Sequence, residues 1–586
     1  MISQSESSPE RGTLDEKKQA EYADTMAPRT PPSEEEASDH MSWKTYAGLL
    51  SLTLSLNGYL FTQIMPSAVL AFINADLGPD TNYVWISVSW NLVAAVVVTI
   101  TGRFADIFGR RWFLISGAAI STLGAIVGAT SQSINQSIAS GVLFGLGGGM
   151  QEMVFSCIQE LVPNNKRFLT IGLFEFGNLP SMFSALISYS FIAHVGSGWR
   201  ACYYFCIAVE GAATIMMFIF YHPPSFETKH QLDKKSRLQL VMETDFVGLI
   251  TFSAACTLLL LAINWGGVLH PWKSAAVIAP IVISGVLFIA LGFWEAYADL
   301  KHPLLPARLF RRFRDFTAIL VVTFVAGMLY YSNLIVWPRL SALVWIPADD
   351  IMKRGLFANI ANWSTPIAAL YGMLIMPWVH HERWQVTGLA TLQTAFTGAL
   401  ASVGRNTQGM TIFFLLVAGS AATATNILVF GTVSLLLEDQ TDIGVAVGLV
   451  STSRLIGGAI AGAIYTSIYS NRYTSEIPSI LQSSASAAGF TGSFSALLAA
   501  SKLNTAAAYN KVAGMTPAVL RAAQIAVQDA YIKSFRLVFL VAIAFGAVAI
   551  CSALMTRSVP MERKTGRRAV TMENEKDMRG TAERSA

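Results

Sequence analysis

The chain has 586 residues, of which 53% are hydrophobic and 13% are charged, against roughly 25% charged residues in ordinary soluble proteins. Its 41 Lys and Arg and 37 Asp and Glu cannot cover a solvated surface of this size. Together with a mean hydropathy of +0.48, this excludes a soluble enzyme. The formal net charge of +4 gives no support for nucleic-acid binding.

Residues 1–44 contain acidic, Pro and Ser residues but no apolar stretch. This composition predicts a disordered tail without a cleavable signal peptide, so the first membrane span is expected to act as the targeting signal. The five cysteines all lie inside apolar runs, and neither a disulfide framework nor a metal site is expected.

Fourteen mostly apolar runs of about 20 residues follow, each long enough to cross a bilayer as a helix. Runs of this length favour helices over barrel strands, which would alternate in segments of about ten residues. The sequence therefore predicts an all-α polytopic membrane protein, with spans at approximately 45–66, 83–101, 112–131, 137–158, 168–192, 199–221, 245–265, 274–295, 316–337, 355–379, 386–404, 411–437, 443–469 and 534–555.

Polar stretches divide these spans into a 6 + 2 + 6 arrangement. We expect an N-terminal six-helix bundle at 45–221, two extra spans with flanking cytoplasmic loops at 222–315, and a C-terminal six-helix bundle at 316–555. Paired six-helix halves around a central cavity are typical of secondary transporters.

The positive-inside rule orients the chain. With both tails on one side, fifteen Lys and Arg lie in the short connections of that side and six in those of the other, which predicts that both termini are cytoplasmic. Residues 556–586 then form a second cytoplasmic tail. The Ser/Ala-rich stretch 470–533 is expected to be an external loop, with an amphipathic helix near 516–533.

The short connection after the second span contains Gly102, Asp106, Gly109, Arg110 and Arg111. The glycines permit a tight turn, Asp106 can accept hydrogen bonds from N–H groups at a helix start, and the arginines lie where positive charge is expected. The order Gly-x-x-x-Asp-x-x-Gly-Arg-Arg between spans 2 and 3 resembles the signature loop of the major facilitator superfamily. That resemblance implies the fold with 14 transmembrane helices and a conformational latch in this loop.

Further stretches resemble the fungal fourteen-span drug:proton antiporters, and within them the trichothecene efflux pump family. They are Gly145-Leu146-Gly147-Gly148-Gly149-Met150-Gln151, Trp199-Arg200, Tyr221-His222-Pro223-Pro224, Thr441-Asp442-Ile443-Gly444 and Ser453-Arg454-Leu455-Ile456-Gly457-Gly458. The resemblance covers about 45–555 and implies proton-driven efflux, without a cofactor.

Two positions depart from the pattern that this resemblance implies. Gly141 stands where many drug antiporters carry an Arg linked to proton coupling, and the span 5 antiporter motif is reduced to Gly177-Asn178-Leu179-Pro180. Proton coupling is therefore expected to use other ionisable groups.

Four charged residues lie away from the ends of the predicted spans, and each costs roughly 2.5–3.5 kcal/mol near a helix centre. Glu152, Glu175, Glu210 and Arg454 are accordingly candidates for proton coupling or for lining the substrate cavity. The alternative is a neutral acid or an internal ion pair that only locks helices together. Close helix packing is expected at small or helix-breaking residues, namely Gly145, Gly149, Gly177, Pro180, Gly458 and Gly462.

These features predict a proton-driven plasma-membrane transporter, a monomer, that exports a small amphipathic compound such as a fungal toxin, secondary metabolite or drug. Its partners would be the substrate, protons and the bilayer. The absence of a Gly-x-x-x-x-Gly-Lys-Ser/Thr loop argues against direct ATP drive. Import by proton symport, for example of a siderophore, remains an alternative, and a transporter-like membrane sensor is a further one.

Overall fold

The computed structural model describes residues 42–223, 236–267, 269–298, 300–346, 350–437, 442–503 and 506–564. Most of the expected tails at 1–44 and 556–586, and part of the polar stretch 222–244, lie outside these residues. Every named element of the described chain is helical.

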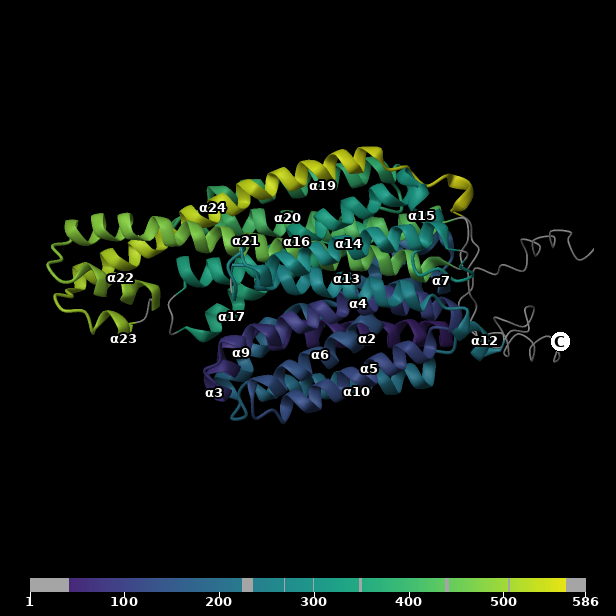
Figure 1. Cartoon of the computed structure of the whole chain (residues 1–586), viewed down its shortest axis with the longest axis horizontal. Coiled ribbons are helices and arrows are strands. Elements are labelled where there is room, and N and C mark those ends of the chain that lie inside the picture. The colour runs from purple at the N-terminus through teal and green to yellow at the C-terminus, as the bar shows by residue number, and fades with distance from the viewer. Residues whose placement is uncertain are drawn as a thin grey trace, which may run out of the picture. The chain divides into compact units, whose positions relative to one another are not determined.

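The N-terminal half is a bundle of helices that run along one common direction, drawn in purple and blue in Figure 1. Its helices are α2 (Trp43–Ala68), α3 (Leu70–Leu77), α4 (Trp85–Phe108), α5 (Arg111–Ala129), α6 (Ile134–Gln151), α7 (Val154–Leu161), α8 (Arg167–Gly177), α9 (Ser184–His194) and α10 (Arg200–Phe220).

The C-terminal half is a second such bundle, drawn in teal to yellow in Figure 1. Its helices are α15 (Ala307–Arg311), α16 (Ala318–Val344), α17 (Ile351–Asn359), α18 (Ser364–Leu374), α19 (Glu382–Ala399), α20 (Gln408–Leu436), α21 (Ile443–Ala487), α22 (Phe494–Leu503), α23 (Ala506–Tyr509) and α24 (Pro517–Met555). Between the halves in sequence come α12 (Arg237–Met242), α13 (Phe246–Trp265) and α14 (Ala275–Tyr297).

Ten helices of the described chain are long and apolar enough to cross a membrane, or eleven if α2 and α3, bent by 59° at their junction, form one span. The three remaining predicted spans are the segments at 168–192, 355–379 and 386–404. The first two are interrupted helices, α8 with α9 and α17 with α18, and the third is α19, which buries several Gln and Thr side chains. The structure is thus consistent with fourteen spans.

Local sequence explains both interruptions. Pro180 is the second residue of the 3₁₀ turn Leu179–Phe183 that separates α8 from α9, since proline fits the first turn of a helix but not its interior. The 3₁₀ turn Ile360–Trp363 separates α17 from α18. The broken spans face each other, because α8 packs on α18 and α9 packs on α17. They form one of the two seams between the halves.

The second seam joins α4 to α21 and is built from small residues. A Cβ added to Gly102 would lie 2.6 Å from the carbonyl oxygen of Gly444, so the two backbones approach closely there. Farther along, the Thr99 and Thr452 hydroxyls are 2.6 Å apart, and Thr452 also donates to the carbonyl of Ala95 at 2.9 Å. The hydroxyl pairs satisfy polar groups inside an otherwise apolar seam.

The stretch 470–533 is mostly helical, so the expected loop is wrong for most of its length. α21 continues to Ala487, α24 begins at Pro517 in agreement with the predicted helix near 516–533, and α22 and α23 lie between them (Figure 1).

These helices share a buried core that includes Leu481, Leu497, Tyr509 and Val527. Burial raises the pKa of Tyr509 to about 12. The Ala-rich sequence forms helices because Ala pays little entropy in a helix and still buries apolar surface. Its external location stays a prediction.

The first residues of the predicted C-terminal tail are ordered against the C-terminal half. The Glu382 carboxylate at the start of α19 accepts from the backbone N–H of Val559 at 3.0 Å and pairs with Lys564 at 2.5 Å. Arg563 donates to the last carbonyls of α20, those of Leu435, Leu436 and Leu437. Residues 556–564, which we call the strap, therefore cap two helix ends that would otherwise leave polar groups unsatisfied.

Candidate transport site between the two halves

The α4–α5 turn carries the predicted latch. α4 ends at Phe108, and Gly109 follows with φ of 95°, a conformation that favours glycine. The turn places Asp106 against the start of α21, where its carboxylate accepts the Val445 N–H at 2.9 Å and Arg110 at 2.9 Å. A carboxylate at a helix N-terminus is favourable because the exposed N–H groups carry partial positive charge. Asp106 thus ties the N-terminal half to the C-terminal half.

Further ion pairs extend this contact. Arg110 is buried and also pairs with Glu160 at 2.5 Å, within the N-terminal half. Arg103 reaches across to Asp442 at 3.4 Å, and Arg308 pairs with the same carboxylate. We call Arg103, Asp106, Arg110 and Asp442 the latch, and the end of the bundle that holds them the latch end; it lies to the right in Figure 1, with α7 and α15.

Within the described residues, Arg111 makes its contacts away from the latch. Its guanidinium donates to the carbonyl of Phe218 at 2.8 Å and lies over the rings of Trp112 and Phe218, inside the N-terminal half. The sequence placed Arg111 in the latch loop together with Gly102, Asp106, Gly109 and Arg110, and in the described chain its contacts with Phe218 lie within the N-terminal half.

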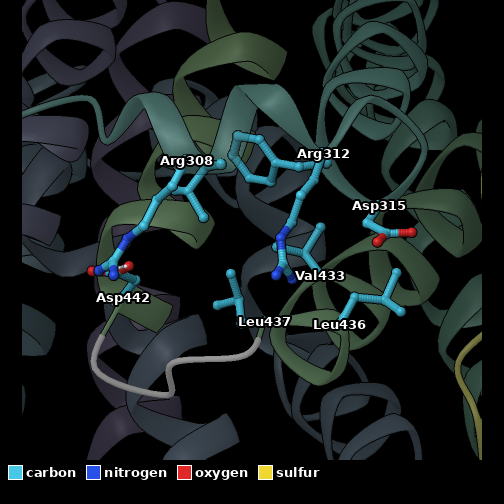
Figure 2. Close-up of a pocket in the computed structure, with 9 residues that line it drawn as sticks. Arg308, Arg312, Asp315, Val433, Leu436, Leu437 and Asp442 are labelled. Carbon is cyan, nitrogen blue, oxygen red and sulfur yellow. Dashed lines mark hydrogen bonds and ion pairs between the residues drawn. The ribbon is translucent and has the colours of Figure 1, made fainter. Parts of the chain in front are cut away.

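A cavity of about 320 Å³ adjoins the latch beneath α15. Figure 2 shows Arg308 pointing toward Asp442 and Arg312 extending into the same cavity, whose other walls include Val433 and Leu437. Arg308 and Asp442 both line the cavity, so the latch borders this cavity at the latch end.

The halves also meet at the opposite end. The N–H of Leu186 in α9 donates to the Asn359 side chain of α17 at 3.5 Å, and a Cβ added to Gly355 would lie 2.6 Å from the Tyr189 side chain. Next to them, the Phe183 and Trp363 rings meet edge to face at 4.9 Å. The two halves are therefore in contact at both ends of the seam.

The centre of the seam contains an ion pair between the halves. Glu152, at the end of α6, is fully buried and pairs with Arg454 of α21. Tyr59 of α2 donates its hydroxyl to the other carboxylate oxygen at 2.6 Å. Both Glu152 oxygens therefore have donors, which is the arrangement expected of an ionised carboxylate.

Aromatic rings surround the cation. The Arg454 guanidinium carbon lies 5.9 Å from the ring centres of both Tyr331 and Phe430. Phe430 in turn stacks on Phe155 of the other half at 4.8 Å. Ring faces attract cations, so the aromatic surroundings stabilise a charge that would be costly in an apolar span.

The other two predicted acids do not reach this pair by hydrogen bonds. Glu175 accepts from the Asn178 side chain at 3.3 Å, next to the break between α8 and α9. Glu210 is fully buried and accepts from Gln151 at 2.7 Å, while its second oxygen has no hydrogen-bond partner in the described chain. A Cβ on Gly58 would lie 2.7 Å from the Glu210 carboxyl carbon, so this acid sits inside the N-terminal half.

The glycine positions act as predicted contacts between helices. Gly145 and Gly149 face α4, where an added Cβ would lie 2.6 Å from the Trp90 carbonyl and 2.8 Å from Val97 respectively. Gly458 and Gly462 pack in the same way against Tyr331 and Ile335 of α16, and Gly177 against Thr53 of α2. Gly141 is equally tight: a Cβ would lie 2.5 Å from the Ser89 hydroxyl, which leaves no room for an arginine side chain.

Sequence reasoning missed four contributors to the site: Tyr59, Glu160, and the roles of Arg103 and Asp442. Asp442 had a usable signal, because it directly precedes the glycine-rich helix that carries Arg454. A single sequence offered no signal for Tyr59, since a tyrosine in a span is ordinary and its partner lies 93 positions away.

Comparison with known proteins agrees with this architecture. The chain is 28% identical to the trichothecene efflux pump TRI12 of Fusarium sporotrichioides over 525 residues, 89% of this chain and 87% of the relative. It is 26% identical to the MFS-type transporter prx5 of Penicillium rubens, covering 90% of this chain and 94% of that one. The human organic anion transporter MFSD10 shares the fold, with a TM-score of 0.50 at 14% identity over 88% of this chain and all of that one.

The family model of the fungal trichothecene efflux pump matches residues 12–565, nearly the whole chain. A transporter family and fold exclude an enzyme, and they account for the paired halves and the latch between them. The chain therefore belongs to the fungal trichothecene efflux pump family of the major facilitator superfamily and is a multi-pass membrane transporter.

Proposed function

We propose that this transporter exports a small amphipathic organic compound, a fungal toxin or related secondary metabolite, in exchange for protons across the plasma membrane. It would act as a monomer with both termini in the cytoplasm. Export is favoured over import because two relatives that match along 89% of this chain are named trichothecene efflux pumps.

The observation that carries the proton part of the proposal is the buried pair of Glu152 and Arg454 between the halves. A proton on Glu152 removes its charge and displaces one of its two donors, so protonation weakens the link between the halves. Breaking a buried ion pair by removing one partner costs about 3–5 kcal/mol. One proton entering down about 100 mV and one pH unit supplies roughly 3.7 kcal/mol, the same order.

The cycle then follows from this link. With Glu152 ionised, the halves are held together at the centre and closed at both ends. With Glu152 protonated, Arg454 keeps its aromatic surroundings but loses its anionic partner, and the halves can separate to release substrate. Alternation between these states exchanges protons for substrate.

The test uses purified protein in liposomes and a radiolabelled trichothecene. We expect Glu152→Gln to abolish uphill transport driven by a pH gradient while leaving downhill exchange within about threefold of wild type, because Gln keeps the size but does not titrate. Glu562→Gln, at an exposed site on the strap, is the matched control. Uphill transport by Glu152→Gln at the wild-type rate would refute proton coupling through this pair.

Orientation has its own test. Ser486 is exposed in the hairpin formed by α21 to α24. A cysteine there, with the exposed Cys551 replaced by Ser, should react with an impermeant thiol reagent on intact cells. Labelling that appears only after permeabilisation would reverse the proposed orientation.

A further inference from the structure

The two extra helices, α13 and α14, pack over the seam that carries the latch. α13 packs on α14 and contacts both α4 and α21, and in Figure 1 the pair lies between the two halves. The shared apolar cluster includes Val96 of α4, Phe252 of α13 and Ile456 of α21. Leu304 and Leu305, from the segment after α14, belong to the same cluster. α13 and α14 therefore contact both helices of the seam. A change in charge at their base, where α13 begins and α14 ends, can act on that seam.

Two carboxyl groups meet at that base. Asp245 precedes α13 and is 4% exposed; its Oδ1 accepts the Gly248 N–H at 2.8 Å and the Trp294 indole N–H at 2.9 Å. Glu295, in the last turn of α14, accepts the Leu305 N–H at 2.8 Å through its Oε1. The Trp294 indole that donates to Asp245 belongs to the residue next to Glu295, so the two carboxyls are neighbours at this base and interact electrostatically.

The remaining oxygens of the two groups, Asp245 Oδ2 and Glu295 Oε2, are both buried and have no donor in the described chain. Two ionised carboxylates at this separation repel each other, and each would leave an unsatisfied buried acceptor. A single proton between them satisfies both oxygens at once, because a protonated carboxyl is a donor.

Arg103 connects this carboxyl pair to the latch. Its Nη1 is 3.4 Å from Asp442, longer than a typical N–H···O hydrogen bond, and its buried Nε has no acceptor in the described chain. Arg103 also lies within electrostatic reach of Glu295. The guanidinium thus interacts electrostatically with two anionic partners, Asp442 in the latch and the pair beneath α13 and α14.

The other charged groups of the described chain around the pair are largely matched to one another. Glu243, beside α13, pairs with Lys301 at 2.8 Å and faces His302 at 3.6 Å, both in the segment after α14. On α21, Asp442 pairs with Arg308 as well as with Arg103. Among these groups, Arg103 is the cation shared between the pair and the latch.

We propose that Asp245 and Glu295 bind one proton between them and that this proton controls the latch through Arg103. The protonated pair carries one negative charge and leaves Arg103 on Asp442, so the latch holds. Loss of the proton gives the pair two negative charges, which draw Arg103 away from Asp442 and weaken the latch. Rising pH at the latch end then favours opening there. The proposal rests on the transporter fold and is independent of proton coupling at Glu152.

The test measures opening directly, without a proton gradient. Spin labels at Trp112 and Trp384, exposed residues of opposite halves at the start of α5 and α19, report the distance across the latch end of the full chain in nanodiscs. Cys551, the exposed cysteine, is replaced by Ser. In wild type, we expect the open fraction to rise about threefold or more between about pH 5.5 and about pH 8.5.

Glu295→Gln reproduces the protonated pair, because its amide donates to Asp245 and the pair keeps a single negative charge. We expect its open fraction to stay at the wild-type low-pH value throughout, while uphill transport persists. Asp245→Asn is the second variant, since Asn keeps the oxygen that caps α13 and supplies the same donor. Glu243→Gln removes a neighbouring carboxylate outside the pair and should retain the wild-type pH response.

Either of two results overturns the proposal. One is a wild-type open fraction that does not change with pH. The other is a wild-type pH response in properly folded Glu295→Gln and Asp245→Asn, which would place the responsible group elsewhere. Neither result bears on the Glu152 test, because that test measures uphill transport and this one measures a distance at equal pH on both sides.

Discussion

Arg454 of the C-terminal half forms an ion pair with Glu152 of the N-terminal half, although 302 positions separate them. Gly141, where a drug antiporter would carry its span 4 arginine, packs too closely on α4 to hold one. The cation beside the span 4 acid therefore comes from the opposite half. The ion pair of Glu152 and Arg454 is therefore a contact between the two halves rather than a contact within one half.

Arg454→Ala should destabilise the protein strongly, by about 3–5 kcal/mol, because it leaves the Glu152 carboxylate buried without its cation. The double variant Glu152→Gln with Arg454→Gln should recover much of this loss, since neither residue is then charged. Thermal unfolding in detergent, followed for all three variants and wild type, measures the difference. Equal loss in the single and double variants would contradict a stabilising pair.

Glu210→Gln should retain more than about half of the wild-type uphill transport, in contrast to Glu152→Gln. The sequence made both acids candidates for proton coupling. In the structure Glu210 hydrogen-bonds to Gln151 within the N-terminal half, so its titration does not act on a contact between the halves. Parallel transport assays of the two variants decide this, and abolished uphill transport in Glu210→Gln would restore the original prediction.

Asp106→Asn combined with Arg110→Ala should slow transport about tenfold or more without loss of expression, because the variant removes both the carboxylate at the α21 N-terminus and its buried partner. Transport per molecule at the membrane is the measurement. Arg111→Ala is the matched control, since Arg111 contacts Phe218 and not the latch. Equal transport in the double variant and the control would reduce the latch loop to a topological signal.

Removal of residues 556–586 should lower the unfolding temperature by several degrees, whereas removal of 565–586 should not. Only the longer deletion removes the Lys564 ammonium from Glu382, which is 1% exposed, and the Arg563 cap from α20. Thermal unfolding of the two truncated proteins is compared. If Glu382→Gln restores stability to the longer deletion, the unpaired carboxylate is the cause; equal stability of both truncations would show that the strap does not stabilise the fold.

Composition and the length of the apolar runs were enough to predict a polytopic membrane protein. The 6 + 2 + 6 order of these runs was enough to predict two paired halves. These properties follow from local physics, because a bilayer demands about 20 apolar residues per helix wherever the chain crosses it. The turn after α4 was predictable for the same reason, because Gly109 signals a turn within a few residues. The latch itself was implied by the family resemblance, and the contact of Asp106 with Val445, 339 positions away, needed the tertiary structure. The hairpin at 470–533 was missed because its burial arises only when α21 to α24 pack on one another.

The sequence by itself determined which residues are charged inside apolar spans, and hence that Glu152, Glu210 and Arg454 needed a physical reason to be there. Only the tertiary structure decided their partners. Helix positions on a single chain fix which side chains share a face but not which face meets another helix, so a pair such as Glu152 and Arg454 becomes visible only once the two halves are packed together. The same holds for Arg103, whose electrostatic interactions with Asp442 and Glu295 depend on three helices from separate parts of the chain.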